Sequence, residues 1–307
     1  MTAIIETRTL SKKYGHALAV SEASFTIEPG EVVGFVGLNG AGKSTTINML
    51  LGFQNPTAGE VRLFGHRVTP VNAHKSHARI GFATGDMSLF DDMTGEQYLA
   101  FVARAYKQKF HTPMFDSLVE RFKPQLKKKI STLSRGNRQK IALVAAFMCE
   151  PELVILDEPS SGLDPLMQQA FLDLVREESA RGVTIFMSSH YLAEVADVCT
   201  RILLIKNGVL TKDIPTSELE LTSGKWVRVV TKQKVMPPKS ADAVKREKNG
   251  DDYVLEFIYK DKALRLQEWL GTLPNLRDMT VSDHNPEAAF EELYEETDQK
   301  EEGVQNV

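Results

Sequence analysis

Hydrophobic and polar positions alternate with two different periods along the chain. Short apolar or alternating runs such as FTIEPGEVVGFVG and GEVRLFG fill residues 1 to about 66, and they predict strands around one helix, TTINMLLG. From Leu153 onward the runs LVILDEP, VTIFMSSH and RILLIKNGVL alternate with helical stretches, one of them from about Pro165 to Arg181. Strands that alternate with helices predict a parallel, doubly wound core, and Asn207-Gly208 predicts a hairpin at its end.

The stretch between these two regions is rich in predicted helix. Thr94 and Gln97 have the spacing of a capping box, and the apolar residues Tyr98, Phe101 and Val102 follow at helical period. We therefore expect a helical subdomain over about residues 88–150.

The pattern changes again after about Lys212. A polar stretch leads to WVRVV, DYVLEFIY and the helical segments ALRLQEWL and PEAAFEELYEE, which predict a small sheet covered by two helices. We expect a large α/β domain over residues 1–215, a linker over 216–225, and a small α+β domain with an acidic tail over 226–307.

Composition narrows the functional classes. The chain has 37 Lys and Arg against 41 Asp and Glu, and eight of the acids lie from Glu287 onward, so the rest is close to neutral. The sequence lacks the basic stripe that is typical of proteins that bind nucleic acid, so we expect no nucleic-acid partner. Its N-terminal residues do not have the pattern of a signal peptide. The longest apolar run, IALVAAFMC, is about half of the ~20 residues that cross a bilayer. A membrane function would therefore need another chain to supply the membrane part.

The segment VGLNGAGKSTT has the composition of a phosphate-binding loop. It joins an apolar strand to a helix, which is the context that a P-loop requires, with a lysine for the β- and γ-phosphates and a serine for Mg²⁺. The predicted nucleotide-binding residues are Gly37, Leu38, Asn39, Gly40, Ala41, Gly42, Lys43, Ser44 and Thr45.

Four further motifs follow in order: LSRGNRQK before a helix, LVILDEP, SGLDP, and FMSSH at the end of a strand. Over residues 1 to about 215 this arrangement resembles the ATP-binding subunit of ABC transporters. The C-terminal part more loosely resembles the extension found on drug, antibiotic and bacteriocin exporter ATPases. The resemblance implies an α/β fold, namely a P-loop NTPase core of ABC type with a helical subdomain, plus a small C-terminal α+β domain. It implies an ATPase with ATP and Mg²⁺ as cofactors.

The resemblance also assigns roles to single residues. Asp157 and Ser44 serve the Mg²⁺ shell, and Glu158 is the candidate general base; alternating directions of strand side chains would separate the two carboxylates. His190 contacts the γ-phosphate, and Tyr14 stacks on adenine. A structural histidine and a core tyrosine remain the alternatives.

The remaining motifs imply partners. The signature residues Ser134, Arg135, Gly136 and Asn137 serve the ATP of the opposite subunit, with Asp164 in the D-loop. Two copies must therefore meet as a homodimer, and a separate transmembrane permease subunit is expected at the cytoplasmic face of the membrane.

Two motifs depart from the family's pattern. Arg135 and Asn137 stand where the signature has Gly and Gln, and the Q-loop glutamine position falls on Gly85, followed by Asp86. The missing side chain predicts that Gly85→Gln raises basal ATPase activity or Mg²⁺ affinity.

Two other functional classes stay open. One is a soluble ABC ATPase acting on ribosomes or DNA. The sequence argues against this class because it contains one P-loop and no long coiled coil between its motifs. The other is a nucleotide-gated regulatory module, against which the chain retains Glu158 and His190.

Overall fold

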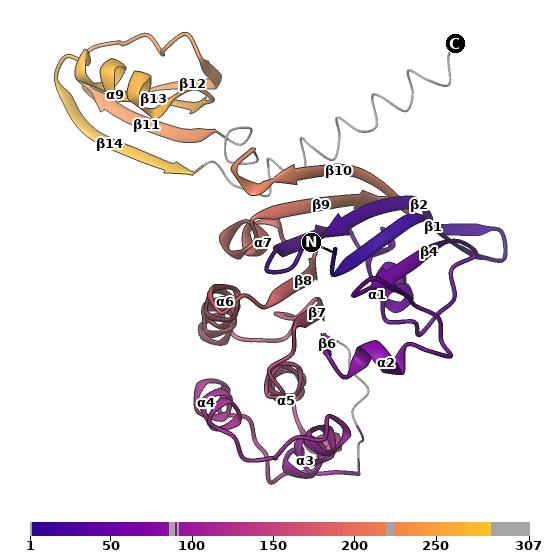
Figure 1. Ribbon diagram of the computed structural model, residues 1–307. Helices are drawn as coiled ribbons and strands as arrows, with labels where there is room; N and C mark the ends of the chain where they lie inside the picture. Colours follow the sequence, from indigo (N-terminus) through magenta and orange to yellow (C-terminus); the bar gives the residue numbers. More distant parts are fainter. Residues whose placement is uncertain (1, 86–89, 91, 219–223, 284–307) are drawn as a thin grey trace, which may run out of the picture. The chain divides into compact units, whose positions relative to one another are not determined.

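The computed structural model describes residues 2–85, 90, 92–218 and 224–283. The chain divides into two compact units, Met1–Asp213 and Ile214–Val307. The first unit is built on a ten-stranded sheet with the order β5-β4-β1-β2-β10-β9-β3-β8-β7-β6 (Figure 1). Its strands are β1 Ile5–Tyr14, β2 Ala17–Ile27, β3 Val32–Val36, β4 Ala58–Leu63, β5 His66–Arg67, β6 Ile80–Thr84, β7 Leu153–Asp157, β8 Thr184–Ser189, β9 Arg201–Lys206 and β10 Val209–Pro215.

One half of this sheet is parallel and the other half is antiparallel. β3 pairs in parallel with β8 and β9, and β7 pairs in parallel with β6 and β8. Every residue of β3, β7 and β8 is buried, as expected for strands covered on both faces. β1 pairs antiparallel with β2 and β4. The predicted parallel core is confirmed, and the antiparallel strands extend it.

Helices cover the parallel strands. The first unit contains α1 Lys43–Leu50, α2 His74–His77, α3 Gly95–Ala105, α4 Pro113–Phe122, the 3₁₀ turn η1 Ile130–Thr132, α5 Arg135–Phe147, α6 Pro165–Ala180 and α7 Leu192–Val198. α1 contacts β2, β4 and β7, strands from both halves of the sheet. Phe25, Phe35 and Phe186 pack beside one another with ring centroids 5.4–6.2 Å apart, which joins β2, β3 and β8 in one core.

The helical stretch begins with the cap that the sequence predicts. Thr94 Oγ1 accepts a hydrogen bond from the Gln97 amide at 3.2 Å, and Gln97 Oε1 accepts one from the Thr94 amide at 2.9 Å. α5 contacts both α3 and α4, so the three helices form one group (Figure 1). The predicted hairpin is also present, because Asn207 and Gly208 both adopt positive φ, 49° and 82°, between β9 and β10.

The second unit contains a four-stranded antiparallel sheet with the order β12-β13-β11-β14. Its elements are β11 Lys225–Thr231, β12 Ala241–Asn249, β13 Asp252–Tyr259, α9 Ala263–Gly271 and β14 Leu276–Asp283. α9 covers the sheet through Leu266 and through Trp269, whose ring lies 5.2 Å from that of Phe257. β12 lies in a Lys-rich stretch for which the sequence predicted no strand. The segment PEAAFEELYEE lies outside the described residues.

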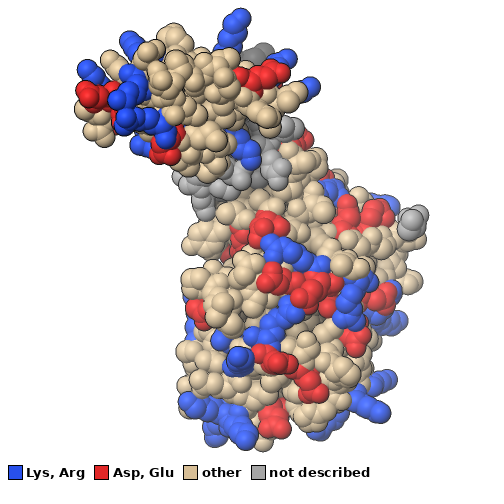
Figure 2. All heavy atoms as spheres, turned by 90° about the vertical axis from the view of Figure 1, so that its left-hand side faces the viewer, with Lys and Arg blue, Asp and Glu red and all other residues tan. Residues whose placement is uncertain are grey.

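Charged side chains of both signs alternate on the face of the first unit that carries α4 and α6 (Figure 2). Arg121 pairs with Glu177 at 2.6 Å, and Arg181 pairs with Glu150 at 3.0 Å. Within the described residues, no helix combines the length and the apolar composition needed to span a membrane.

Candidate active site

The loop between β3 and α1 is a tight turn that depends on glycine. Gly42 has φ 110°, a conformation that strongly favours glycine, and a Cβ there would lie 2.5 Å from the carbonyl oxygen of Ala19. A Cβ on Gly37 would lie 2.4 Å from the carbonyl oxygen of Ile205. The loop therefore packs directly against β2 and β9, with α1 beginning at Lys43.

Lys43 is buried, with 6% of its surface exposed. Its Nζ donates to the carbonyl oxygens of Gly37 at 2.6 Å and Leu38 at 3.3 Å, and it lies 3.2 Å from Glu158 Oε1. A buried ammonium requires such partners. The loop closes around its own lysine, and Glu158 provides the one carboxylate that faces it among the described residues.

A cavity of about 200 Å³ opens at this loop. Its lining combines loop backbone, the start of α1 and one acid; the residues are Ala19, Asn39, Gly40, Gly42, Lys43, Ser44, Thr45 and Glu158. Four of these residues belong to the first turn of α1 or precede it directly, so amide groups at a helix N-terminus face the cavity. The cavity suits an anion.

Two carboxylates leave the end of β7 in different directions. β7 ends at Asp157, and Glu158 adopts a positive φ of 52°. Asp157 Oδ1 accepts a hydrogen bond of 2.5 Å from Ser188 Oγ, whereas Glu158 turns toward Lys43. The separation arises from this strained turn and not from strand alternation, which corrects the reason predicted from the sequence. Positive φ in a non-glycine residue costs energy and is often retained at functional sites.

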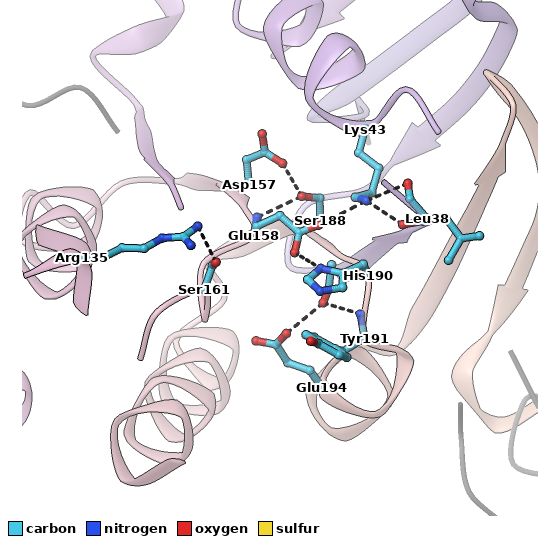
Figure 3. A network of polar contacts seen from close by, with 12 residues as sticks. Leu38, Lys43, Arg135, Asp157, Glu158, Ser161, Ser188, His190, Tyr191 and Glu194 are labelled. Atoms are coloured by element: carbon cyan, nitrogen blue, oxygen red, sulfur yellow. Dashed lines mark hydrogen bonds and ion pairs between the residues drawn. The ribbon is translucent and has the colours of Figure 1, made fainter. Parts of the chain in front are cut away.

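His190 completes the group. Its Nδ1 lies 2.5 Å from Glu158 Oε2, and its side chain is partly exposed (Figure 3). A carboxylate only accepts hydrogen bonds, so Nδ1 carries the proton in this contact and Nε2 faces away from it. Glu158 Oε1 is buried and faces the Lys43 ammonium at 3.2 Å, so the two oxygens of this carboxylate lie against two different side chains.

Comparison with known proteins identifies this arrangement. Residues 20–161 match the family described as ABC transporter. The bacitracin transport ATP-binding protein BcrA of Bacillus licheniformis is 30% identical over 286 residues, which cover 92% of this chain and 90% of that protein. This chain belongs to the ABC transporter ATP-binding family. It is therefore an ATPase subunit that serves transport.

Two further similarities agree with that assignment. The Nod factor export ATP-binding protein I of Burkholderia pseudomallei is 34% identical over 208 residues, which cover 66% of this chain and 68% of that protein. A solved structure described as an ATP-binding subunit of an ABC transporter is 30% identical with a TM-score of 0.63, and the match covers 71% of this chain and 92% of that chain. The predicted fold class is confirmed.

The ABC signature segment begins α5. Ser134 is the N-cap, whose Oγ accepts from the Asn137 amide at 3.4 Å and from Asn137 Nδ2 at 3.3 Å. Arg135 donates to Ser161 Oγ at 2.8 Å within the same chain. Ser134, Arg135, Gly136 and Asn137 are absent from the lining of the P-loop cavity. Asp164 caps α6, since its Oδ1 accepts from the Met167 amide at 3.0 Å.

Tyr14 lies at the end of β1 and is 47% exposed, so it is not a core tyrosine. Its hydroxyl donates to Gln54 Oε1, and Lys12 Nζ lies 5.3 Å from the ring centroid. The ring does not line the P-loop cavity, although Ala19 on the paired strand does.

The Q-loop position lies close to Glu158, the candidate general base. The Gly85 amide donates to the Asp157 carbonyl oxygen at 2.7 Å, and a Cβ on Gly85 would lie 2.7 Å from the Glu158 carbonyl oxygen. A side chain at residue 85 would therefore require a shift of the Glu158 backbone. Asp86 lies outside the described residues.

Several supporting residues escaped sequence analysis. Ser188 Oγ accepts from the Glu158 amide at 3.1 Å while it donates to Asp157, so one hydroxyl fixes both acids. Ser189 Oγ donates to Glu194 Oε2 at 2.9 Å. The signal in the sequence was two serines at the end of the otherwise largely apolar run VTIFM.

A larger hollow of about 540 Å³ lies beside α2, away from these residues. Arg79 in its wall already binds Glu152 at 2.5 Å and stacks on Phe64 at 3.8 Å. Among the described residues, no group of three His, Cys, Asp or Glu side chains could hold a metal ion.

Proposed function

We propose that this chain binds ATP with Mg²⁺ and hydrolyses it to power export through a separate transmembrane permease subunit, at the cytoplasmic face of the membrane. The observation that carries the catalytic part is the position of Glu158 between the Lys43 ammonium and the His190 imidazole. One carboxylate thus contacts both of the side chains that would face a γ-phosphate.

The residues around the P-loop cavity would divide the work of ATP binding and hydrolysis. When ATP binds, Lys43 releases Glu158 and binds the β- and γ-phosphates, and the loop amides bind the remaining phosphate oxygens. Glu158, freed from Lys43, accepts a proton from the attacking water. His190 orients Glu158 and faces the γ-phosphate through its partly exposed edge. Tyr14 offers an exposed aromatic face to adenine.

Mg²⁺ would be held by Ser44 and, through water, by Asp157. Hydroxyl and carboxylate oxygens are the hard donors that Mg²⁺ prefers, and the ion usually keeps several waters, so a site without three acidic ligands suits it. When bound, the ion neutralises charge on the β- and γ-phosphates. Ser188 keeps the Asp157 carboxylate fixed for this contact.

The active unit is a homodimer. The signature residues at the start of α5 do not line the P-loop cavity of their own chain, so they are available to the nucleotide of a second copy. Ser134 and the α5 N-terminus supply the phosphate contacts there, with Asp164 in the D-loop beside them.

Export is favoured by the relatives, since the names of the similar proteins describe bacitracin transport and Nod factor export. The match to the bacitracin protein covers 92% of this chain and so extends into the C-terminal unit. We assign residues 1–215 to the ATPase domain, 216–225 to a linker, and 226–307 to an accessory α+β domain.

A steady-state ATPase assay of the full chain tests this function. Mg²⁺-dependent ATP hydrolysis that Lys43→Ala abolishes together with nucleotide binding is the expected result. A wild-type chain that binds ATP and releases no phosphate, alone or with a co-expressed permease, would contradict the proposal.

A further inference from the structure

Two of the residues that depart from the family's motifs, Arg135 and Gly85, lie next to the same serine. Arg135 Nη2 donates to Ser161 Oγ at 2.8 Å. A Cβ on Gly85 would lie 3.1 Å from Ser161 Cβ, so Ser161 already fills the space beside Gly85. Ser161 belongs to the D-loop, defined here as residues 160–164, and it therefore stands between the signature helix and the Q-loop position.

The start of α5 and the D-loop approach each other closely. A Cβ on Gly136 would lie 2.6 Å from the carbonyl oxygen of Gly162. A Cβ on Gly162 would lie 3.1 Å from Arg135 Cγ, so the aliphatic stem of Arg135 covers that glycine. The hydrogen bond to Ser161 is thus one part of a continuous contact.

The charge of Arg135 is unusual for its place. Arg135 is the first residue of α5, where the helix dipole disfavours a cation, and no acidic residue lies in the first turn. No carboxylate pairs with Arg135 among the described residues, and its hydrogen bond to Ser161 is the polar contact that it makes there. A residue that opposes the local preference is explained by a tertiary role.

The D-loop is fixed at its other side by the catalytic acid. The Ser161 amide donates to the Glu158 carbonyl oxygen at 3.2 Å, and that same carbonyl lies against Gly85. Movement of Ser161 would therefore displace both Gly85 and the Glu158 backbone.

We infer that Arg135, through Ser161, holds the D-loop against the Gly85 backbone and so positions Glu158. Arg135 and Gly85 then compensate for one another: the serine held by the arginine occupies the space next to the backbone where other members carry a glutamine side chain. Arg135 is a positioning residue in this role. The inference rests on the proposed function of Glu158.

A double-mutant cycle in the full chain tests the contact. We expect Arg135→Ala and Ser161→Ala each to lower kcat about fivefold, with KM for Mg·ATP changed less than twofold, because the phosphate contacts proposed for Ser134 and the α5 N-terminus stay in place. The double variant should be no slower than either single variant, since each removes the same interaction. Arg135→Lys should recover most of the rate, because an ammonium can still donate to Ser161.

Arg138→Ala is the matched control. It removes an exposed arginine from the same helical turn, for which the described residues show no side-chain partner, and we expect its kcat to stay within twofold of wild type. A roughly 25-fold loss in the double Arg135/Ser161 variant, or a raised KM at constant kcat in Arg135→Ala, would overturn the inference.

Hydrogen exchange supplies a readout that does not depend on hydrolysis. Peptides covering residues 160–164 and residue 85 should exchange faster in Arg135→Ala and not in Arg138→Ala, with unchanged exchange in β11 and β13. Unchanged exchange at the D-loop would refute the positioning role. A wild-type chain without ATPase activity would instead refute the proposed function. Hydrogen exchange at residues 160–164 would then still decide whether Arg135 holds the D-loop.

Discussion

Glu158 Oε1 lies 3.2 Å from Lys43 Nζ, so the candidate base and the P-loop lysine share one ion pair. Both groups are partly or fully withdrawn from water, and Lys43 is the more buried of the two. Nucleotide binding must therefore exchange this contact for one between Lys43 and phosphate.

Replacing Glu158 by glutamine tests its role as base. An amide cannot accept the proton of the attacking water, so Glu158→Gln should lower turnover by roughly 10²- to 10⁴-fold. ATP affinity should persist or increase, because the competing negative charge beside Lys43 is gone. Phosphate release and equilibrium nucleotide binding measure the two effects, and size-exclusion chromatography with ATP should show a trapped dimer. Near-normal turnover would mean that another residue is the base.

Adding a side chain at residue 85 should impair the enzyme. A Cβ there would lie 2.7 Å from the Glu158 carbonyl oxygen, so Gly85→Ala and Gly85→Gln must shift the backbone at Glu158. We expect both to lower kcat and to destabilise the fold by roughly 1–3 kcal/mol, as overpacking does. The sequence alone had favoured increased activity for Gly85→Gln.

Gly271→Ala is the control for that prediction, because a Cβ on Gly271 would have nothing within 4 Å. Urea unfolding and steady-state ATPase assays should separate the two sites. An active, fully stable Gly85→Ala would show that the Glu158 turn adapts without cost.

Glu194 should make stability depend on pH. Burial raises the pKa of this carboxyl, an effect that hydrogen bonds from Ser160 and Ser189 oppose, while the charge of Glu158 adds to it and that of His190 opposes it. The folded chain then keeps a proton at pH values where the unfolded chain has lost it. Its contribution to stability is therefore present below the ordinary glutamate range and is lost as pH rises through the raised pKa.

Glu194→Gln removes this titration and keeps an acceptor for Ser189. We expect the variant to become more stable relative to wild type from pH 5 to pH 8, so that the difference in their unfolding free energies grows in favour of the folded variant. Urea denaturation at several pH values measures the difference, with exposed Glu120→Gln as control. A pH-independent difference would show that Glu194 titrates normally.

Removing the C-terminal unit should spare nucleotide chemistry. The chain divides between Asp213 and Ile214, and every residue that lines the P-loop cavity precedes that point. A chain that ends at Thr222 retains β10 and should bind ATP with unchanged affinity, as measured by fluorescent nucleotide titration. We expect weaker dimerisation or permease assembly. A soluble, folded truncation that no longer binds ATP would contradict this domain assignment.

Local features of the structure followed directly from the sequence. The Thr94 and Gln97 capping box and the Asn207-Gly208 turn form as predicted, because each depends on hydrogen bonds and φ preferences within a few residues. The P-loop motif and the strand and helix around it also identified the place where phosphate chemistry is expected. The sequence of β7 did not predict the directions of the Asp157 and Glu158 side chains. Glu158 has a positive φ, and a glutamate at that position does not indicate one.

The sequence by itself determined which residues are candidates for the chemistry, because short motifs fix the local backbone and the donor groups. Only the tertiary structure decided how those residues meet. Glu158 and His190 directly follow the ends of the neighbouring parallel strands β7 and β8. Ser161 lies between Arg135 and Gly85, and these contacts join distant parts of the chain. Such contacts depend on strand order and on close packing between segments. Those are properties of the whole core, which no short stretch of sequence encodes.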